Sequence, residues 1–149
     1  MKKLAMSASR LLAATLAASP VASGPAFGGE AEPVPSLSLE LNGLDATDAG
    51  CRFTFVIANG LGAPLDKAGF EIVLFDKAGL VSRLVTLDFK ELPDGKTKVR
   101  QFDLPGVDCA GLVRVLVNDA TECSGAGIDA GACIGMLKAS TRTVVEFGS

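Results

Sequence analysis

The chain contains no histidine, no tryptophan and no tyrosine among its 149 residues. Histidine is the commonest general base and a frequent metal ligand, so its absence removes the usual route to both kinds of site. Trp and Tyr are the side chains that usually stack on sugars, so a carbohydrate-binding surface is disfavoured. Eight phenylalanines remain, and most of them lie in segments that alternate apolar and polar residues, which is typical of a core.

Long apolar runs are also missing. The apolar run at residues 11–18 has eight residues, whereas a membrane-spanning helix needs about 20. It follows the basic Lys2, Lys3 and Arg10 and precedes small residues and prolines. That order is typical of a cleavable secretory signal, although a retained N-terminal anchor is the alternative.

The expected organisation follows from this signal. We expect a signal peptide at residues 1–26, cleaved after Ser23 or Ala26, a flexible tail at residues 27–35 and one folded domain at residues 36–149. Export would place the domain in the periplasm or outside the cell, where disulfides form.

Cleavage makes the chain more acidic. It removes three of the 14 basic residues and none of the 17 acidic ones, so the formal net charge changes from −3 to −6. An acidic domain repels nucleic acid and gains nothing from an anionic membrane surface. We therefore expect no nucleic-acid partner, no membrane span after processing, and a protein of the cell envelope as the partner.

The domain reads as short strands separated by turns. Apolar and polar residues alternate with a period of two, which is typical of strands with one buried face. The expected strands are residues 36–41, 51–57, 69–75, 81–89, 96–104, 112–117 and 140–147. About seven strands without a long amphipathic helix predict an all-β fold, an immunoglobulin-like antiparallel β-sandwich, with a closed barrel as the alternative. Residues 118–139 lack a clear period and are expected to form a long loop.

Four cysteines are expected to form disulfides: Cys51, Cys109, Cys123 and Cys133. In such a sandwich the second and sixth strands face each other across the core. Cys51 opens the second strand and Cys109 lies just before the sixth, so the two come near at one end. Cys123 and Cys133 lie within the expected loop. The predicted bridges are therefore Cys51–Cys109 and Cys123–Cys133. The alternatives, a redox-active pair and a zinc site, lack the C-x-x-C spacing that each usually needs.

Acidic residues in the expected loops are candidate binding residues. Asp119, Glu122 and Asp129 lie in the long loop, and Asp45 and Asp48 in the first one. Carboxylates in glycine-containing loops can bind calcium, although the EF-hand spacing is absent and Asp is also a common turn former. A calcium site is therefore only an alternative, and we expect no metal and no cofactor.

Four arginines are the other candidates. Arg52, Arg83, Arg100 and Arg114 alternate with apolar residues on four strands. We expect them on an outer sheet face, where they either keep that face soluble or receive an anionic partner. No catalytic motif accompanies them, since the S-x-x-K pattern is absent from the mature chain and no serine has a histidine to activate it. An enzyme is therefore not expected.

Several short motifs resemble those of a known family. The turn Leu92-Pro93-x-Gly95 and the stretches at residues 51–55, 73–76, 99–105 and 115–119 carry the resemblance. From residue 37 onwards the chain resembles a family of small exported bacterial immunoglobulin-like proteins of uncharacterised function, usually labelled only by their signal sequence. The resemblance implies export and a sandwich fold, and it supplies no catalytic or binding residue. The chain lacks the arginine pair that the twin-arginine signals of some relatives carry.

These observations predict a non-catalytic exported module of the cell envelope. We expect it to bind another protein through a sheet edge or through the bridged loop at residues 118–139. The alternative is a small-ligand or calcium-binding periplasmic protein that uses the acidic loops.

Overall fold

The structure is a computed structural model that describes residues 32–149. Within this range, Pro33–Ser149 form one compact unit. The predicted signal peptide at residues 1–26 lies outside the described residues, as does the predicted tail up to residue 31. None of the helices in the described range has the length and apolar character that crossing a membrane requires.

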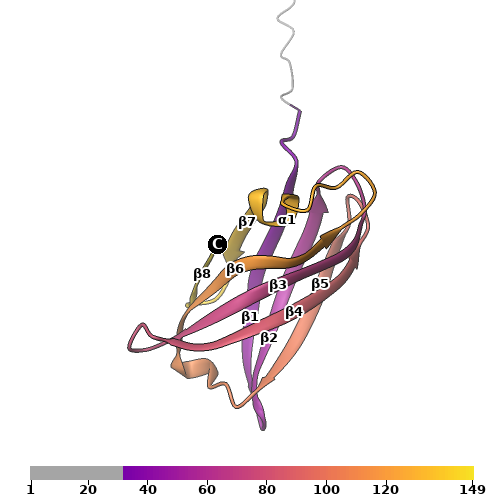
Figure 1. Ribbon diagram of the computed structural model, residues 1–149. Helices are drawn as coiled ribbons and strands as arrows, with labels where there is room; N and C mark the ends of the chain where they lie inside the picture. The colour runs from indigo at the N-terminus through magenta and orange to yellow at the C-terminus, as the bar shows by residue number, and fades with distance from the viewer. Residues whose placement is uncertain (1–31) are drawn as a thin grey trace, which may run out of the picture. The chain divides into compact units, whose positions relative to one another are not determined.

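The described chain is almost entirely β-structure in two sheets, which confirms the prediction of an all-β sandwich, although the sheets are mixed rather than purely antiparallel. Its strands form two four-stranded sheets, a first sheet in the order β5-β2-β1-β7 and a second sheet in the order β4-β3-β6-β8 (Figure 1). Most neighbours are antiparallel, but β7 runs parallel to β1 and β8 parallel to β6. The elements are β1 (Ser36–Thr47), β2 (Gly50–Gly60), β3 (Leu65–Asp76), β4 (Val81–Leu92), β5 (Thr97–Pro105), the 3-10 helix η1 (Cys109–Gly111), β6 (Leu112–Ser124), α1 (Ala132–Gly135), β7 (Leu137–Thr141) and β8 (Glu146–Gly148).

One apolar core fills the space between the two sheets. Alternation along β2 turns Phe53, Phe55 and Ile57 inward, and all three side chains are completely buried. The Phe55 ring packs edge-to-face against Phe89 of β4, with 5.5 Å between the ring centroids. Phe89 packs in the same way against Phe70 of β3, so aromatic rings connect the two sheets.

Both predicted disulfides are confirmed. Cys51 at the start of β2 is bonded to Cys109 in η1, with 5.2 Å between their Cα atoms. Cys123 of β6 is bonded to Cys133 in α1, with 5.8 Å between their Cα atoms. The first bridge joins the first sheet to the segment that leads into the second sheet. The second bridge fastens the connection after β6 to the end of that strand.

The predicted loop at residues 118–139 is wrong at both ends, since β7 already begins at Leu137. β6 continues to Ser124, because it pairs with β3 as far as Lys67. The β3–β6 register shifts at three places, and each shift interrupts the regular alternation from which a strand is recognised. The bridged loop is therefore confined to the residues between β6 and α1.

Two other expected boundaries are also wrong. The expected last strand at residues 140–147 is divided into β7 in the first sheet and β8 in the second sheet, with a turn between them. The expected first loop is a tight hairpin, because β1 pairs with β2 as far as Thr47 opposite Gly50. Asp45 therefore lies in β1 and not in a loop.

Candidate functional site

The predicted arginines do not share a surface. Arg52 lies on the first sheet and donates two hydrogen bonds to Asp103, with Nε–Oδ1 and Nη2–Oδ2 distances of 2.6 and 2.9 Å. These hydrogen bonds, more than the charge itself, lower the pKa of the Asp103 carboxyl. Arg114 lies on the second sheet, where its guanidinium is 5.3 Å from the centroid of the Phe75 ring and its Nε is 3.5 Å from Glu146.

The prediction of an outer face is wrong for two of the four arginines. Arg83 lies opposite the buried Leu74 and so points to the inner side of the second sheet. The β2–β5 register places Arg100 opposite Phe55, so the Arg100 side chain points to the inner side of the first sheet. Because β5 is an edge strand, this side chain leaves the core sideways and reaches β4, where its Nε donates a hydrogen bond of 2.9 Å to the Phe89 carbonyl.

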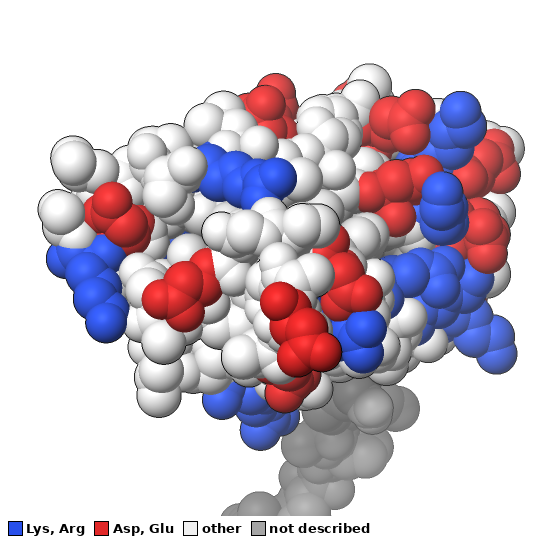
Figure 2. All heavy atoms as spheres, turned by 90° about the horizontal axis from the view of Figure 1, so that it is seen from below, with Lys and Arg blue, Asp and Glu red and all other residues white. Residues whose placement is uncertain are grey.

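Seen from the end of the molecule that carries η1, acidic and basic side chains are scattered and neither sign forms a continuous patch (Figure 2).

The predicted acidic residues are not brought together either. Asp119 and Glu122 lie in β6 rather than in a loop, and Glu122 is 3.8 Å from the Lys67 ammonium. Asp129 accepts a hydrogen bond of 2.8 Å from the Gly131 backbone N–H, which stabilises the turn before α1. Within residues 32–149, no three His, Cys, Asp or Glu side chains are grouped so that they could hold a metal ion.

The edges of the two sheets differ in how well they are protected. An unpaired edge strand exposes backbone groups that can pair with another chain, and proteins usually block such pairing with short strands, bulges or inward charges. The edge strands β7 and β8 have five and three residues. β5 carries the inward charges of Lys98 and Arg100, which lie close to Glu91. The second half of β4 has a bulge at Lys90, whose φ is 64°.

The first half of β4, residues 81–87, is less protected, and we refer to it as the free edge. Its register against β3 shifts at Ser82. Arg83, on the inner side, is its one charged residue. Val81 and Leu84 are 53% and 56% exposed. On the outer face of the second sheet, Leu84 lies directly opposite Val73, which in turn lies opposite Leu116 of β6. The free edge therefore continues into an apolar strip across this face.

Some backbone groups of the free edge are directed away from the sheet. The Asp76 N–H donates a hydrogen bond to the Leu80 carbonyl, and the Leu74 carbonyl accepts one from the Ser82 hydroxyl, so both residues direct their backbone groups toward β4. Backbone direction alternates along a strand, so Arg83 and Val85, the partners of Leu74 and Ile72, are bonded to β3. Leu84 and Thr86 therefore direct their N–H and C=O groups outward. For residues 81–87, the described chain contains no backbone hydrogen bond outside the sheet ladder.

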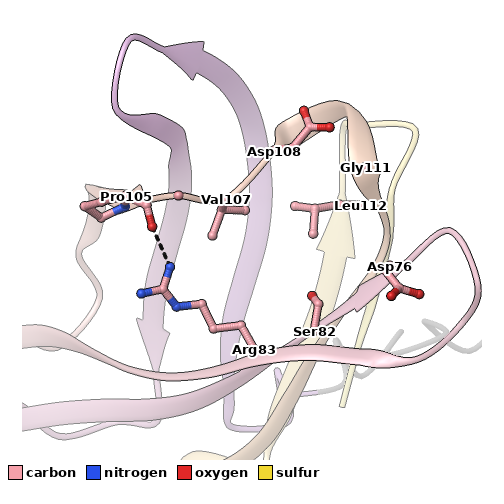
Figure 3. Close-up of a pocket in the computed structure, with 9 residues that line it drawn as sticks. Asp76, Ser82, Arg83, Pro105, Val107, Asp108, Gly111 and Leu112 are labelled. Atoms are coloured by element: carbon pink, nitrogen blue, oxygen red, sulfur yellow. Dashed lines mark hydrogen bonds between the residues drawn. The ribbon is translucent and has the colours of Figure 1, made fainter.

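A groove of about 520 Å³ adjoins the start of the free edge (Figure 3). It lies between the β3–β4 turn and the segment that connects β5 to β6. Arg83 Nη1 donates a hydrogen bond of 2.7 Å to the Pro105 carbonyl across the groove. Its lining residues are Asp76, Ser82, Arg83, Pro105, Gly106, Val107, Asp108, Gly111 and Leu112.

The other polar side chains of the groove hold the backbone in place. Asp76 Oδ1 accepts hydrogen bonds from the backbone N–H groups of Ala78 and Leu80 and so closes the β3–β4 turn. Asp108 Oδ1 accepts one from Ala110 and caps η1. The groove is therefore a shaped surface beside an unpaired strand. Its titratable side chains do not face each other as a pair of catalytic groups would.

No known family model and no curated protein matches the chain. Among solved structures, a partial likeness is found to the Salmonella enterica trimeric lipoprotein SadB, with a TM-score of 0.41 and 21% sequence identity. The matched part covers 47% of this chain and 40% of the SadB chain, so less than half of that protein is spanned.

Proposed function

We propose that the protein is a non-catalytic, exported binding module of immunoglobulin-like type, which holds an extended segment of another cell-envelope protein against the free edge of β4. The observation that carries the proposal is the contrast between this edge and the others. Residues 83–87 are regularly paired with β3, carry the single charge of Arg83, and expose Leu84 and the outward backbone groups of Leu84 and Thr86. The second half of β4, together with β5, β7 and β8, is bulged, more highly charged or short.

Strand addition suits this surface physically. A segment that pairs with an exposed edge gains main-chain hydrogen bonds, and its alternate side chains contact the two faces of the sheet. The apolar strip formed by Leu84, Val73 and Leu116 supports one of these faces. The groove beside Arg83 supports the other. The bridged loop, the other predicted surface, retains only Asp129 of the three acidic candidates.

A location outside the cytoplasm is part of the proposal. The two disulfides support it, because such bonds persist in oxidising compartments. The signal-like N-terminal sequence also supports it. We propose the periplasm or the exterior of the cell as the location of the mature protein.

The test is a cross-linking and affinity purification from the native envelope, with mature protein that carries Thr86→Pro. Proline removes the outward N–H of Thr86 without removing a hydrogen bond of the β3–β4 ladder, and edge positions of this kind tolerate it. We expect the variant to lose a stoichiometric partner that the unchanged protein retains. Far-UV circular dichroism and a free-thiol assay verify that the variant is folded and fully disulfide-bonded.

A second variant keeps the test decisive if proline prevents folding. Leu84→Lys places a charge on the free edge at a side chain that is already 56% exposed. Val99→Lys is the matched control, because Val99 is 57% exposed on the other long edge strand, β5. Loss of the partner with Leu84→Lys alone supports the proposal. Equal retention by Leu84→Lys and Val99→Lys overturns it.

A further inference from the structure

The charge beside the free edge points to the chemistry of its occupant. Resting on the proposed function, we infer that the bound segment carries a carboxylate side chain opposite Arg83 and apolar side chains at the flanking positions. The occupant is thus an extended, acidic segment of a partner protein with one apolar face. Three features of β4 lead to this inference.

The first feature is the direction in which Arg83 points. Arg83 lies opposite Leu74, whose side chain is completely buried, so the Arg83 side chain leaves β4 on the inner side and reaches the groove. Side chains directly opposite each other in paired strands point to the same side of the sheet. A residue of the bound segment opposite Arg83 therefore enters the groove beside the guanidinium.

The second feature is the unused hydrogen-bonding capacity of Arg83. A guanidinium has five N–H donors, and Arg83 donates one of its hydrogen bonds to the Pro105 carbonyl. The ion pairs within residues 32–149 do not include Arg83. A carboxylate that enters the groove can accept two parallel hydrogen bonds from such a fork.

Two aspartates on the groove would favour a cation instead, but their positions do not suit that role. Asp76 and Asp108 lie on the side of the groove away from the guanidinium, and their carboxylates are directed outward from it (Figure 3). Both use Oδ1 to hold local turns. Of these three charged residues, Arg83 alone lies on β4, the strand with which the segment pairs. Its charge therefore always lies opposite the same residue of the bound segment.

The third feature is the opposite face of the same strand. Leu84 and Thr86 point to the outer face, where Leu84 meets the apolar strip of Val73 and Leu116. Residues of the bound segment opposite Leu84 and Thr86 extend this strip. Apolar and β-branched side chains at these positions give the best cross-strand contacts.

The test uses two labelled synthetic peptides, SVTVEVTVS and SVTVKVTVS, which differ only in the central charge. We expect the glutamate peptide to bind the unchanged protein about fivefold or more tightly than the lysine peptide in fluorescence anisotropy at low salt. Arg83→Glu should reverse this preference. Lys77→Glu is the control, because Lys77 lies in the neighbouring β3–β4 turn, and it should leave the preference unchanged.

Three outcomes would overturn the inference. The first is equal affinity for both peptides, or no binding of either peptide at about 1 mM, which would show that the occupant has no carboxylate opposite Arg83. The proposed function would still stand in that case if the Leu84→Lys variant loses the native partner. The second is a change in peptide preference that is as large for Lys77→Glu as for Arg83→Glu. It would mean that the preference comes from the overall electrostatic potential of the protein and not from a contact in the groove. A dimer in sedimentation velocity that Leu84→Lys dissociates means that a second copy of the chain occupies the edge.

Discussion

A single buried polar side chain organises the end of the molecule opposite η1. Asn59 is 1% exposed, and its amide nitrogen donates hydrogen bonds of 2.9 Å to the carbonyls of Ala63 and Leu92. Its amide oxygen accepts a hydrogen bond of 3.0 Å from the Leu61 N–H. Asn59 thereby ties together the end of β2, the loop before β3 and the end of β4. In the sequence it shows only as part of an Asn-Gly turn signal.

We predict that Asn59→Ala lowers the free energy of unfolding by about 2 kcal/mol, because it leaves two carbonyls and one N–H buried without partners. Urea denaturation of the oxidised protein measures the change. Asn42→Ala is the control, since Asn42 is exposed and hydrogen-bonded only to Glu40, and surface substitutions usually change stability by less than about 0.5 kcal/mol. Equal midpoints for the two variants would contradict the role of Asn59.

Individual elements could be predicted where local rules decide them. The alternation along β2 is regular from Gly50 to Gly60, and the strand is found there. The end of β6 was missed because register shifts against β3 break its alternation, and a shift depends on the partner strand. The edge strands could not be predicted, because sheet order is set by contacts distant in sequence. Neither the free edge nor the groove was therefore visible in the sequence.

Arg100 was misplaced for a related reason. Charged side chains normally point outward, but on an edge strand an inward side chain can pass between the sheets and reach solvent. The Arg100 side chain passes between the sheets in this way and donates a hydrogen bond to the Phe89 carbonyl on β4. Without this hydrogen bond, the Phe89 carbonyl would be free to accept one from another strand.

We predict that Arg100→Val destabilises the fold by about 1–2 kcal/mol and promotes self-association. The substitution removes a hydrogen bond from a charged donor and the inward charge that protects the edge. Thermal unfolding and sedimentation velocity measure the two effects. Gln101→Val is the matched control, because Gln101 is the next residue of β5 and bonds to Thr54 on the outer face. If both variants sediment as monomers, Arg100 does not protect the edge.

At the scale of the whole molecule, the two bridges restrict the unfolded chain unequally. The Cys51–Cys109 bond spans a sequence separation of 58 residues and the Cys123–Cys133 bond one of 10. On the chain-entropy model the longer link stabilises by about 4 kcal/mol and the shorter by about 3 kcal/mol.

We predict that the double variant Cys51→Ala/Cys109→Ala is less stable than Cys123→Ala/Cys133→Ala by about 1 kcal/mol or more, because it also opens the link between the sheets. Urea unfolding of both variants against the unchanged protein measures the difference. The reverse order of stabilities would show that α1 and its loop, rather than the link between the sheets, limit the stability of the fold.

The charges of the whole molecule determine how its stability depends on pH. Hydrogen bonds from Arg52, Lys98 and Lys90 lower the pKa values of Asp103, Glu91 and Asp88 below their ordinary range. A carboxyl with a lowered pKa in the folded state stabilises the fold above its unfolded pKa, and this contribution is lost as the pH falls through the folded pKa. The contribution is therefore complete above about pH 5 and declines progressively below about pH 4, as the pH falls toward the lowered pKa values of the folded state.

We accordingly predict a plateau of stability between about pH 5 and pH 8, because the chain has no histidine to titrate there, followed by a fall on acidification. Urea midpoints measured at fixed ionic strength across this range test the prediction. Asp103→Asn should make the acidic fall shallower, since it removes one carboxyl with a lowered pKa. A loss of stability that begins between pH 5 and pH 8 would mean that a group other than these ion pairs controls the acid response.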